Sequence, residues 1–116
     1  MKITLYGLAS CDSCRRARRW LETRGVDFRF LDLRETPPST GTLDRWARAA
    51  GWERLLNRRS TTWRALPPAQ REGLDKNRAV TLMAAHPTLV KRPVLEAGEK
   101  LSVGIDEVAW QRIIEP

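Results

Sequence analysis

The fold is decided by residues 3–25, which read ITLYGLASCDSCRRARRWLETRG. Apolar residues alternate over residues 3–6, as they do in a half-buried strand. The basic segment 14–24 has helical spacing, and Gly25 is expected to end that helix. Residues 27–33 then read as extended. The chain is therefore predicted to open as strand, helix, strand, with Cys11 and Cys14 at the first strand-to-helix turn.

Cys11 and Cys14 are the only cysteines, and their position favours thiol chemistry. A thiolate at a helix start is stabilised by unpaired backbone N–H groups and by the positive end of the helix dipole, so its pKa falls. The arginines at 15, 16, 18 and 19 add positive charge. Asp12 acts in the opposite direction, because a neighbouring carboxylate disfavours a second negative charge.

Three other interpretations of the cysteine pair are open. A zinc site needs four ligands. Besides the two cysteines the sequence has one histidine, His86, so no metal is expected. A structural disulfide across so short a loop would remove little unfolded-state entropy. Two inert buried cysteines are the stronger alternative, because Cys14 shares a helical face with Ala17 and Leu21.

Length and composition indicate one domain over residues 1–116. A chain of 116 residues with 41% hydrophobic content is long enough for one compact core. No apolar run approaches the roughly 20 residues that a membrane span requires. We therefore expect a cytoplasmic monomer without a membrane segment, in which the dithiol is reduced by default.

The formal net charge of +7 comes mostly from arginine and favours an anionic partner. The charge does not choose among oxyanions, glutathione, nucleic acid and an acidic protein face, and many arginines on helices simply face solvent. Direct nucleic-acid binding is not expected, because most of the tryptophans that could stack on bases fall at or beside apolar helix positions: Trp20, Trp46, Trp52 and Trp110. Trp63 is ambiguous.

The rest of the chain reads as a helical stretch followed by a hairpin and a closing helix. The predicted helical stretch has a turn at 35–40, a helix capped by Ser39 or Thr40 and ended by Gly51, a polar loop at 57–63, a break at 67–68, and a helix capped by Asp75 or Asn77 that ends before Pro87. The predicted hairpin has a strand at 89–96 interrupted by Pro93, a turn at Gly98 and a strand at 100–103. The closing helix is capped by Asp106.

This order resembles the thioredoxin-like fold, and within it the arsenate reductase and Spx branch, closest to the YffB-type glutathione-dependent thiol reductases. The resemblance spans almost the whole chain. It rests on these segments: Leu5-Tyr6-Gly7 with Cys11-Asp12, residues 16–21, Gly51-Trp52-Glu53 with Leu55-Leu56-Asn57, Arg59 with residues 61–64 and Leu66, and Lys91-Arg92-Pro93. It implies an α/β fold with a mixed four-stranded sheet, β-α-β … β-β-α, and an all-helical insert at about residues 37–88.

The resemblance also implies a site. Cys11 would be the nucleophile and Cys14 a resolving thiol, with Arg59 and Arg92 near them as anion-binding residues and Pro93 as a cis-proline facing the thiols. The chain departs from the glutaredoxin-coupled arsenate reductases, because Ile105 stands where they carry a third arginine. Arg59 is displaced too, with Asn57 in the expected register. Fewer converging cations would bind arsenate weakly.

Two classes of function follow. The first is a thiol-disulfide oxidoreductase that uses glutathione as co-substrate, with no bound cofactor and with glutaredoxin as an optional partner. The second is an Spx-like redox-sensing regulator, because Cys14 restores the Spx cysteine pair. Spx-type proteins bind the carboxy-terminal domain of the RNA polymerase α subunit. The enzyme is favoured, because the segments at 57–66 and 91–93 follow the YffB-type pattern more closely. A true arsenate reductase is the remaining alternative.

Overall fold

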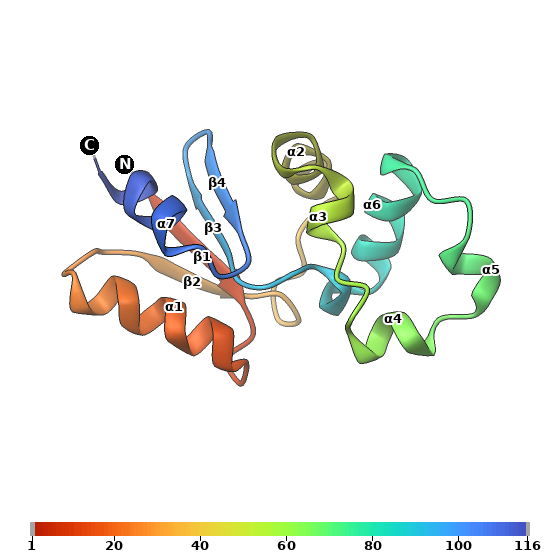
Figure 1. Ribbon diagram of the computed structural model, residues 1–116, viewed down its shortest axis with the longest axis horizontal. Coiled ribbons are helices and arrows are strands. Elements are labelled where there is room, and N and C mark those ends of the chain that lie inside the picture. The colour runs from red at the N-terminus through yellow and green to blue at the C-terminus, as the bar shows by residue number, and fades with distance from the viewer. Residues whose placement is uncertain (1, 116) are drawn as a thin grey trace. The chain divides into compact units, whose positions relative to one another are not determined.

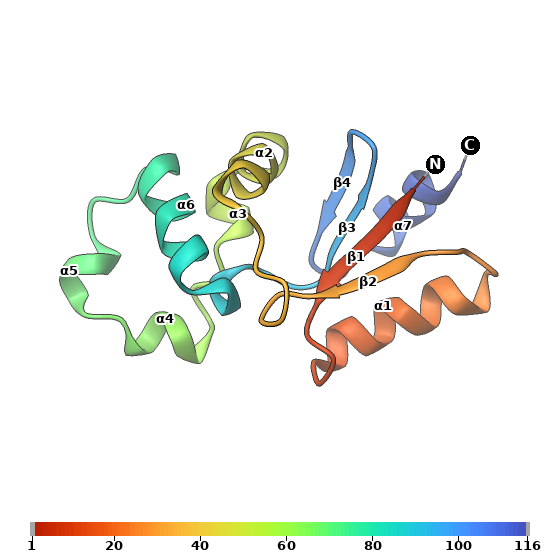
Figure 2. The same ribbon diagram turned by 180° about the vertical axis from the view of Figure 1, so that it is seen from behind.

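The computed structural model describes residues 2–115, and the chain divides into two compact units. The sheet unit comprises the chain up to Thr36 and from Arg92 onward, and the insert unit comprises Pro37–Lys91. All strands lie in the sheet unit, and the insert unit consists of helices and loops (Figures 1 and 2). An all-helical insert is thus confirmed, although the unit runs to Lys91. That residues 1–116 form one domain stays a prediction.

The sheet unit has the predicted β-α-β … β-β-α order. Its elements are β1 (Ile3–Gly7), α1 (Asp12–Thr23), β2 (Arg29–Asp32), β3 (Val94–Ala97), β4 (Lys100–Val103) and α7 (Glu107–Ile114). The strands lie in the order β2-β1-β3-β4; β1 pairs in parallel with β2, and the other neighbours are antiparallel. This confirms the mixed four-stranded sheet of the thioredoxin-like fold.

Helix α1 begins earlier than its apolar spacing predicts. Its N-cap is Cys11 and its first residue is Asp12, so Cys14 lies in the first turn rather than at the start. At the other end Arg24 is the C-cap, and Gly25 follows with φ +65° and donates its N–H to the Glu22 carbonyl at 3.0 Å. Glycine adopts this left-handed conformation without steric cost, which ends the helix where the sequence predicts.

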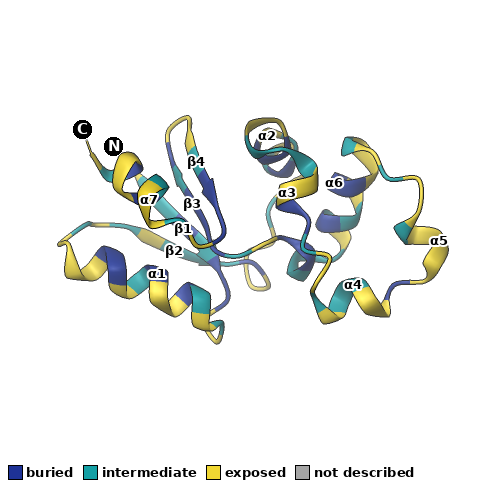
Figure 3. Ribbon diagram, viewed as in Figure 1, coloured by how far each residue is buried: buried dark blue, intermediate teal, exposed yellow. Residues whose placement is uncertain are grey.

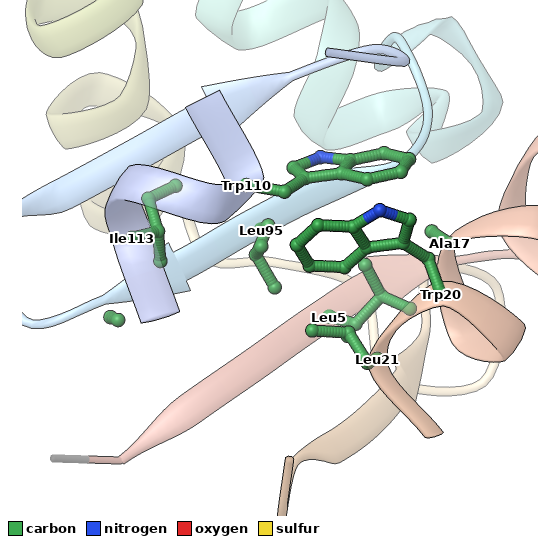
Figure 4. Packing of buried hydrophobic residues seen from close by; sticks show 8 residues of the cluster. Leu5, Ala17, Trp20, Leu21, Leu95, Trp110 and Ile113 are labelled. Atoms are coloured by element: carbon green, nitrogen blue, oxygen red, sulfur yellow. The ribbon is translucent and has the colours of Figure 1, made fainter. Parts of the chain in front are cut away.

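The core of the sheet unit lies between one face of the sheet and helices α1 and α7. The buried residues that form it are Leu5, Ala17, Trp20, Leu21, Leu95, Ala97, Trp110 and Ile113. Trp20 of α1 and Trp110 of α7 meet edge to face, with ring centroids 5.4 Å apart and planes at 61° (Figure 4). Because each large apolar side chain contributes about 1.5–3 kcal/mol on burial, this cluster holds both helices firmly on the sheet.

The strand predicted over residues 89–96 is shorter in the structure. Leu89 closes a 3₁₀ helix (Pro87–Leu89), and β3 begins only at Val94. Pro93 has no N–H to donate to a neighbouring strand, which is why regular pairing starts after it. The Arg92–Pro93 peptide bond is cis, as the resemblance implies. The hairpin turn at Gly98 and the strand at 100–103 are confirmed.

The insert unit is built from short helices. They are α2 (Thr40–Ala50), α3 (Trp52–Leu55), α4 (Thr61–Ala65), α5 (Pro68–Arg71) and α6 (Lys76–Ala85), followed by the 3₁₀ helix. Of the alternative caps, Ser39 accepts the Thr42 N–H at 3.1 Å and Asp75 accepts the Arg78 N–H at 2.8 Å. These side chains satisfy backbone donors that a helix start leaves unpaired.

The loop predicted over residues 57–63 is partly helical, since α4 begins at Thr61. Ser60 caps it by accepting the Trp63 N–H at 3.1 Å. Neither α4 nor α5 contains a buried residue, whereas α2 and α6 do (Figure 3). The outer helices of the insert are therefore held by local hydrogen bonds and caps more than by a core.

Candidate functional site

The turn between β1 and α1 holds Cys11 at the helix start. The Cys11 N–H donates to the Leu8 carbonyl at 3.1 Å, and the Cys11 carbonyl accepts the Arg15 N–H at 2.9 Å as the first helical bond. The Cys11 side chain is half-buried. Asp12, the neighbour expected to oppose ionisation, is 99% exposed and lies 3.6 Å from the Arg15 guanidinium, so water screens its charge.

Cys14 lies behind Cys11, fully buried against β1. The Leu8 N–H donates to its Sγ at 3.4 Å. Gly7 leaves the space for this sulfur, because a Cβ at residue 7 would overlap the Cys14 Sγ and lie 3.1 Å from the Cys14 Cβ. The φ angle of Gly7 is not positive, so glycine is needed here for close approach and not for its backbone conformation.

Two opposing effects set the pKa of Cys11. Partial burial raises the pKa, because it disfavours the charged thiolate. Hydrogen bonds from the Cys14 backbone N–H, the Cys14 thiol, the Arg92 side chain and the Ser13 backbone N–H stabilise the thiolate and lower the pKa below its ordinary value. The net direction is downward, so Cys11 carries more thiolate near neutral pH than a free cysteine does.

The pKa of Cys14 moves the other way. Burial raises it to about 12, even though the Leu8 N–H and the charge of Arg92 act to lower it. The neighbouring Cys11 contributes to this rise, both as a hydrogen-bond partner and as a negative charge. The two thiols therefore differ in kind: Cys11 is accessible and ionises readily, and Cys14 is enclosed and stays protonated.

Arg92 and Pro93 belong to the same unit as the thiols. Arg92 is half-buried and its guanidinium hydrogen-bonds to Cys11, so the structure brings these two predicted residues together. Pro93 follows it through the cis bond and accepts the Gly104 N–H at 2.8 Å on its carbonyl. The expected roles of Arg92 and Pro93 in binding a substrate stay predictions.

Arg59 belongs to the insert unit. It is exposed, its N–H donates to Asn57 Oδ1 at 3.0 Å, and its carbonyl accepts Arg64 Nη2 at 2.9 Å. These bonds fix the backbone of the loop and leave the Arg59 guanidinium toward solvent within that unit. That Arg59 acts beside Cys11 stays a prediction.

Sequence reasoning missed Asp32, at the carboxyl end of β2. Its carboxylate accepts N–H groups from Ala9 at 3.3 Å, Arg34 at 2.8 Å and Glu35 at 3.3 Å. Burial raises the pKa of Asp32, but the three hydrogen bonds together outweigh this effect and lower the pKa below its ordinary value. Parallel strands β1 and β2 end at the same edge of the sheet, so an aspartate ending one strand could have been expected to brace the loop that follows the other.

Within residues 2–115, no three His, Cys, Asp or Glu side chains form a metal-binding group. None of the helices in this part of the chain has the length and apolar character that crossing a membrane requires.

The mixed sheet, the dithiol at the start of α1 and the cis-proline before β3 define a protein of the thioredoxin-like superfamily. Within this superfamily the chain belongs to the ArsC family, which it matches over residues 6–113. The recognition drawn from the sequence is thus confirmed.

The similar proteins carry names that describe different functions or none. The structure of a YffB protein is 38% identical with a TM-score of 0.94, and the match covers 98% of this chain and 100% of that one. An uncharacterised protein of Haemophilus influenzae is 35% identical over 94% of this chain and 96% of its own length. The global transcriptional regulator Spx of Listeria innocua is 28% identical, covering 97% and 86%. The chain is therefore an arsenate reductase-like or Spx-like thioredoxin-fold protein.

Proposed function

We propose that this protein is a thiol-disulfide oxidoreductase in which Cys11 is the nucleophile and Cys14 the resolving thiol. The observation that carries the proposal is the contrast between the two sulfurs. Cys11 is accessible with a lowered pKa, and Cys14 is buried with its pKa raised to about 12. A nucleophile needs access and thiolate character, whereas a resolving thiol must stay protected until the first step has occurred.

In the first step the Cys11 thiolate attacks one sulfur of a substrate disulfide. A bond forms between Cys11 Sγ and that sulfur, the substrate S–S bond breaks, and the leaving thiolate takes the electron pair and then a proton. In the second step Cys14 loses its proton and attacks Cys11 Sγ. The second substrate thiol is released, and a Cys11–Cys14 disulfide forms. The substrate gains two electrons and the protein loses two.

The pKa of Cys14 is expected to change between these steps. Two of the causes that raise it, the hydrogen bond to Cys11 and the negative charge on Cys11, disappear once Cys11 is bonded to the substrate. The pKa of Cys14 then falls from about 12, although its burial persists. The order of events is thereby set by the charge of Cys11.

Glutathione is the proposed reductant that returns the protein to the dithiol. Two glutathione molecules reduce the Cys11–Cys14 disulfide and leave as glutathione disulfide, or one resolves a Cys11–glutathione mixed disulfide directly. Arg92 supports this choice, because a guanidinium beside Cys11 can bind a peptide carboxylate through two parallel hydrogen bonds. Arg59 is proposed to contribute a second anion contact.

The test combines turnover with binding. With glutathione and the mixed disulfide of glutathione and 2-mercaptoethanol, the wild type should turn over and Cys11→Ser should not. A glutathione titration followed by chemical shifts should give saturable changes around Cys11 and Arg92. Absence of both turnover and binding would overturn the oxidoreductase proposal.

A redox-controlled regulator is the second candidate. It is favoured by the 28% identity to Spx over 97% of this chain, together with the dithiol itself. In this case oxidation of Cys11 and Cys14 to a disulfide would alter a surface that docks on the carboxy-terminal domain of the RNA polymerase α subunit. Binding of that domain by the oxidised chain and not by the reduced chain, without disulfide turnover, would favour the regulator.

Arsenate reduction is expected to be negligible. The segment at 103–106 presents Ile105 and no cation, so an arsenate dianion would gain little stabilisation as charge develops. The measurement is arsenate turnover with glutathione and glutaredoxin present. Robust turnover would contradict this expectation.

A further inference from the structure

Two consecutive peptide groups of the thiol turn, residues 7–11, connect the end of β2 to the cysteines. In the first group, the Gly7 carbonyl accepts the Leu33 N–H at 2.9 Å, and the Leu8 N–H donates to Cys14 Sγ at 3.4 Å. A peptide group is planar, so fixing the direction of its carbonyl also fixes the direction of its N–H. The backbone that follows β2 therefore orients the Leu8 N–H toward the sulfur of Cys14.

The second peptide group is also held on both sides, in this case by a side chain. The Ala9 N–H donates to Asp32 Oδ2 at 3.3 Å, and the Leu8 carbonyl in the same group accepts the Cys11 N–H at 3.1 Å. The Asp32 carboxylate is thus joined to the N-cap of α1 through one peptide group. Leu8 belongs to both groups, so losing the Asp32 contact also loosens the N–H that Leu8 donates to Cys14.

The two oxygens of Asp32 have separate partners. Oδ1 accepts the N–H groups of Arg34 at 2.8 Å and Glu35 at 3.3 Å in the turn that follows β2, whereas Oδ2 accepts the Ala9 N–H in the thiol turn. An asparagine can keep its oxygen on the first two donors, but it places its amide nitrogen, which is itself a donor, opposite Ala9. Asp32→Asn therefore removes the contact to the thiol turn and retains the turn after β2.

We propose that Asp32 is a positioning residue for the second step of thiol exchange, in which it holds the thiol turn so that the Leu8 N–H stabilises the Cys14 thiolate. This inference rests on the proposed oxidoreductase function and adds a residue to the step in which Cys14 attacks. Within residues 2–115, the Asp32 carboxylate bonds to backbone donors and to neither sulfur. Its effect on Cys14 therefore passes through the peptide group between Leu8 and Ala9.

The second step starts from a disulfide between Cys11 and glutathione. Cys14 gives its proton to water, its thiolate attacks Cys11 Sγ, and the bond between Cys11 and glutathione breaks. Glutathione leaves with the electron pair and takes a proton, so Cys14 is oxidised and glutathione is reduced. The negative charge lies on Cys14 Sγ as the attack begins, and the Leu8 N–H donates to this sulfur. A turn that holds this donor in place therefore increases the share of Cys14 that is ready to react.

The charge of Asp32 acting directly through space would have the opposite effect. Asp32 lies opposite Gly7 in the parallel pair of β1 and β2, and the sulfur of Cys14 packs against Gly7. A nearby negative charge disfavours a thiolate, so removing that charge would favour the Cys14 thiolate and speed the second step. The positioning role and the charge role of Asp32 thus predict opposite changes in Asp32→Asn.

The test follows the Cys11–glutathione adduct. Wild type and Asp32→Asn are mixed with glutathione disulfide, quenched with acid at intervals, and analysed by mass spectrometry for the adduct and for the Cys11–Cys14 disulfide. At pH 7 we expect the adduct to resolve about fivefold more slowly in Asp32→Asn, which corresponds to the net value of one hydrogen bond. This difference should shrink at high pH, where Cys14 is ionised in both proteins. A loss of structure would instead slow the step at every pH.

Two further variants serve as controls. Glu35→Gln removes an exposed carboxylate from the same turn and should resolve the adduct at the wild-type rate. Asp32→Ser keeps a hydroxyl that can accept an N–H of the turn after β2 but lacks the second oxygen, so it should show the same slowing as Asp32→Asn. Formation of the adduct should stay within about twofold of wild type in each variant, because the groups that lower the pKa of Cys11 lie in α1 and at Arg92.

The rate of resolution decides the role of Asp32. Resolution by Asp32→Asn and Asp32→Ser at the wild-type rate or faster would overturn this inference, and so would an equal slowing at every pH, while the oxidoreductase stands in both cases. A wild type that forms the adduct but no Cys11–Cys14 disulfide would overturn the resolving role of Cys14 and this inference with it. A wild type that forms no adduct with any disulfide would overturn the oxidoreductase itself.

Discussion

The sheet unit and the insert unit differ in how deeply their helices are buried and in which candidate site residues they carry. In the sheet unit, α1 and α7 bury large side chains against the sheet, and the groups with the largest effects on the thiol pKa values belong to this unit. In the insert unit, α4 and α5 contain no fully buried residue and Arg59 lies on an exposed loop. The main causes of the lowered pKa of Cys11 therefore lie within the sheet unit. We propose that the insert contributes to substrate recognition, so that a change in the insert alters binding and not the pKa of the thiol.

The largest effect is expected from removing the nucleophile. Cys11→Ser should reduce turnover to the uncatalysed rate, because a serine hydroxyl does not ionise near neutral pH and cannot form the mixed disulfide. The measurement is reduction of the glutathione and 2-mercaptoethanol mixed disulfide. Cys14→Ser is the matched control and should still form a stable mixed disulfide at Cys11, visible by mass spectrometry. Substantial turnover by Cys11→Ser would show that the chemistry does not reside at this turn.

A large effect is also expected from Arg92, the cation that helps to lower the pKa of Cys11. Because Arg92 helps to lower the pKa of Cys11, Arg92→Ala should raise that pKa, and by less where water screens the pair. The alkylation rate of Cys11 rises as the pH passes the pKa of Cys11. In Arg92→Ala this rise should occur at higher pH than in wild type. Arg92→Lys should restore part of the lowering of the Cys11 pKa but less of the glutathione binding. A lysine ammonium is a point charge and lacks the planar, two-point donor of a guanidinium. Ultraviolet absorbance of the thiolate, followed against pH for wild type, Arg92→Ala and Arg92→Lys, measures the pKa of Cys11. Three superimposable curves would contradict the role of Arg92.

A smaller effect is expected from Asp32, which supports the thiol loop from β2. Asp32→Asn should lower the free energy of unfolding by about 1 kcal/mol at pH 7, because the Asp32 carboxylate accepts three backbone N–H groups. The folded pKa is depressed, so this stabilisation is fully present above the ordinary pKa near 4 and is lost as pH falls through the folded pKa. Urea unfolding of both proteins should therefore give a difference that shrinks on acidification. A difference that does not depend on pH would point to packing instead of charge.

The smallest effect is expected from the insert. Arg59→Ala should raise KM for a glutathione disulfide a few-fold, the loss of about 1 kcal/mol for an exposed charged contact, and leave the pKa of Cys11 where it is in wild type. Arg64→Ala, an exposed arginine of the same unit, is the control. A change in the pKa of Cys11 in Arg59→Ala would contradict the expectation that groups of the sheet unit determine this pKa.

The same contrast explains what the sequence could predict. The strands and α7 follow from regular apolar spacing, except that the strand predicted from residue 89 begins only at Val94. The mixed sheet was predicted from the resemblance. The predicted start of α1 was wrong because it was taken from helical spacing, which begins at residue 14, whereas Cys11 caps the helix without a side-chain bond. Helices α4 and α5 bury no apolar stripe, so spacing gives no signal for them.

The candidate site divides in a similar way. Cys11 and Cys14 were predicted as site residues from their position, and Arg92 and Pro93 from the resemblance. Asp32 and Gly7 were missed because their contacts join strands and loops that are distant along the chain. The opposite pKa directions of the two thiols also depend on burial, which spacing at the first turn does not separate.

The close approach of Gly7 to Cys14 has a consequence for how this chain can change over generations. A side chain at position 7 would collide with the sulfur at position 14, although the backbone at Gly7 would accept one. The two positions are therefore coupled, and the order of replacements matters. A lineage that first loses the sulfur at position 14 opens position 7 to alanine, whereas a lineage that first acquires alanine at position 7 disturbs the dithiol. Glycine at position 7 is thus retained for as long as the second thiol is.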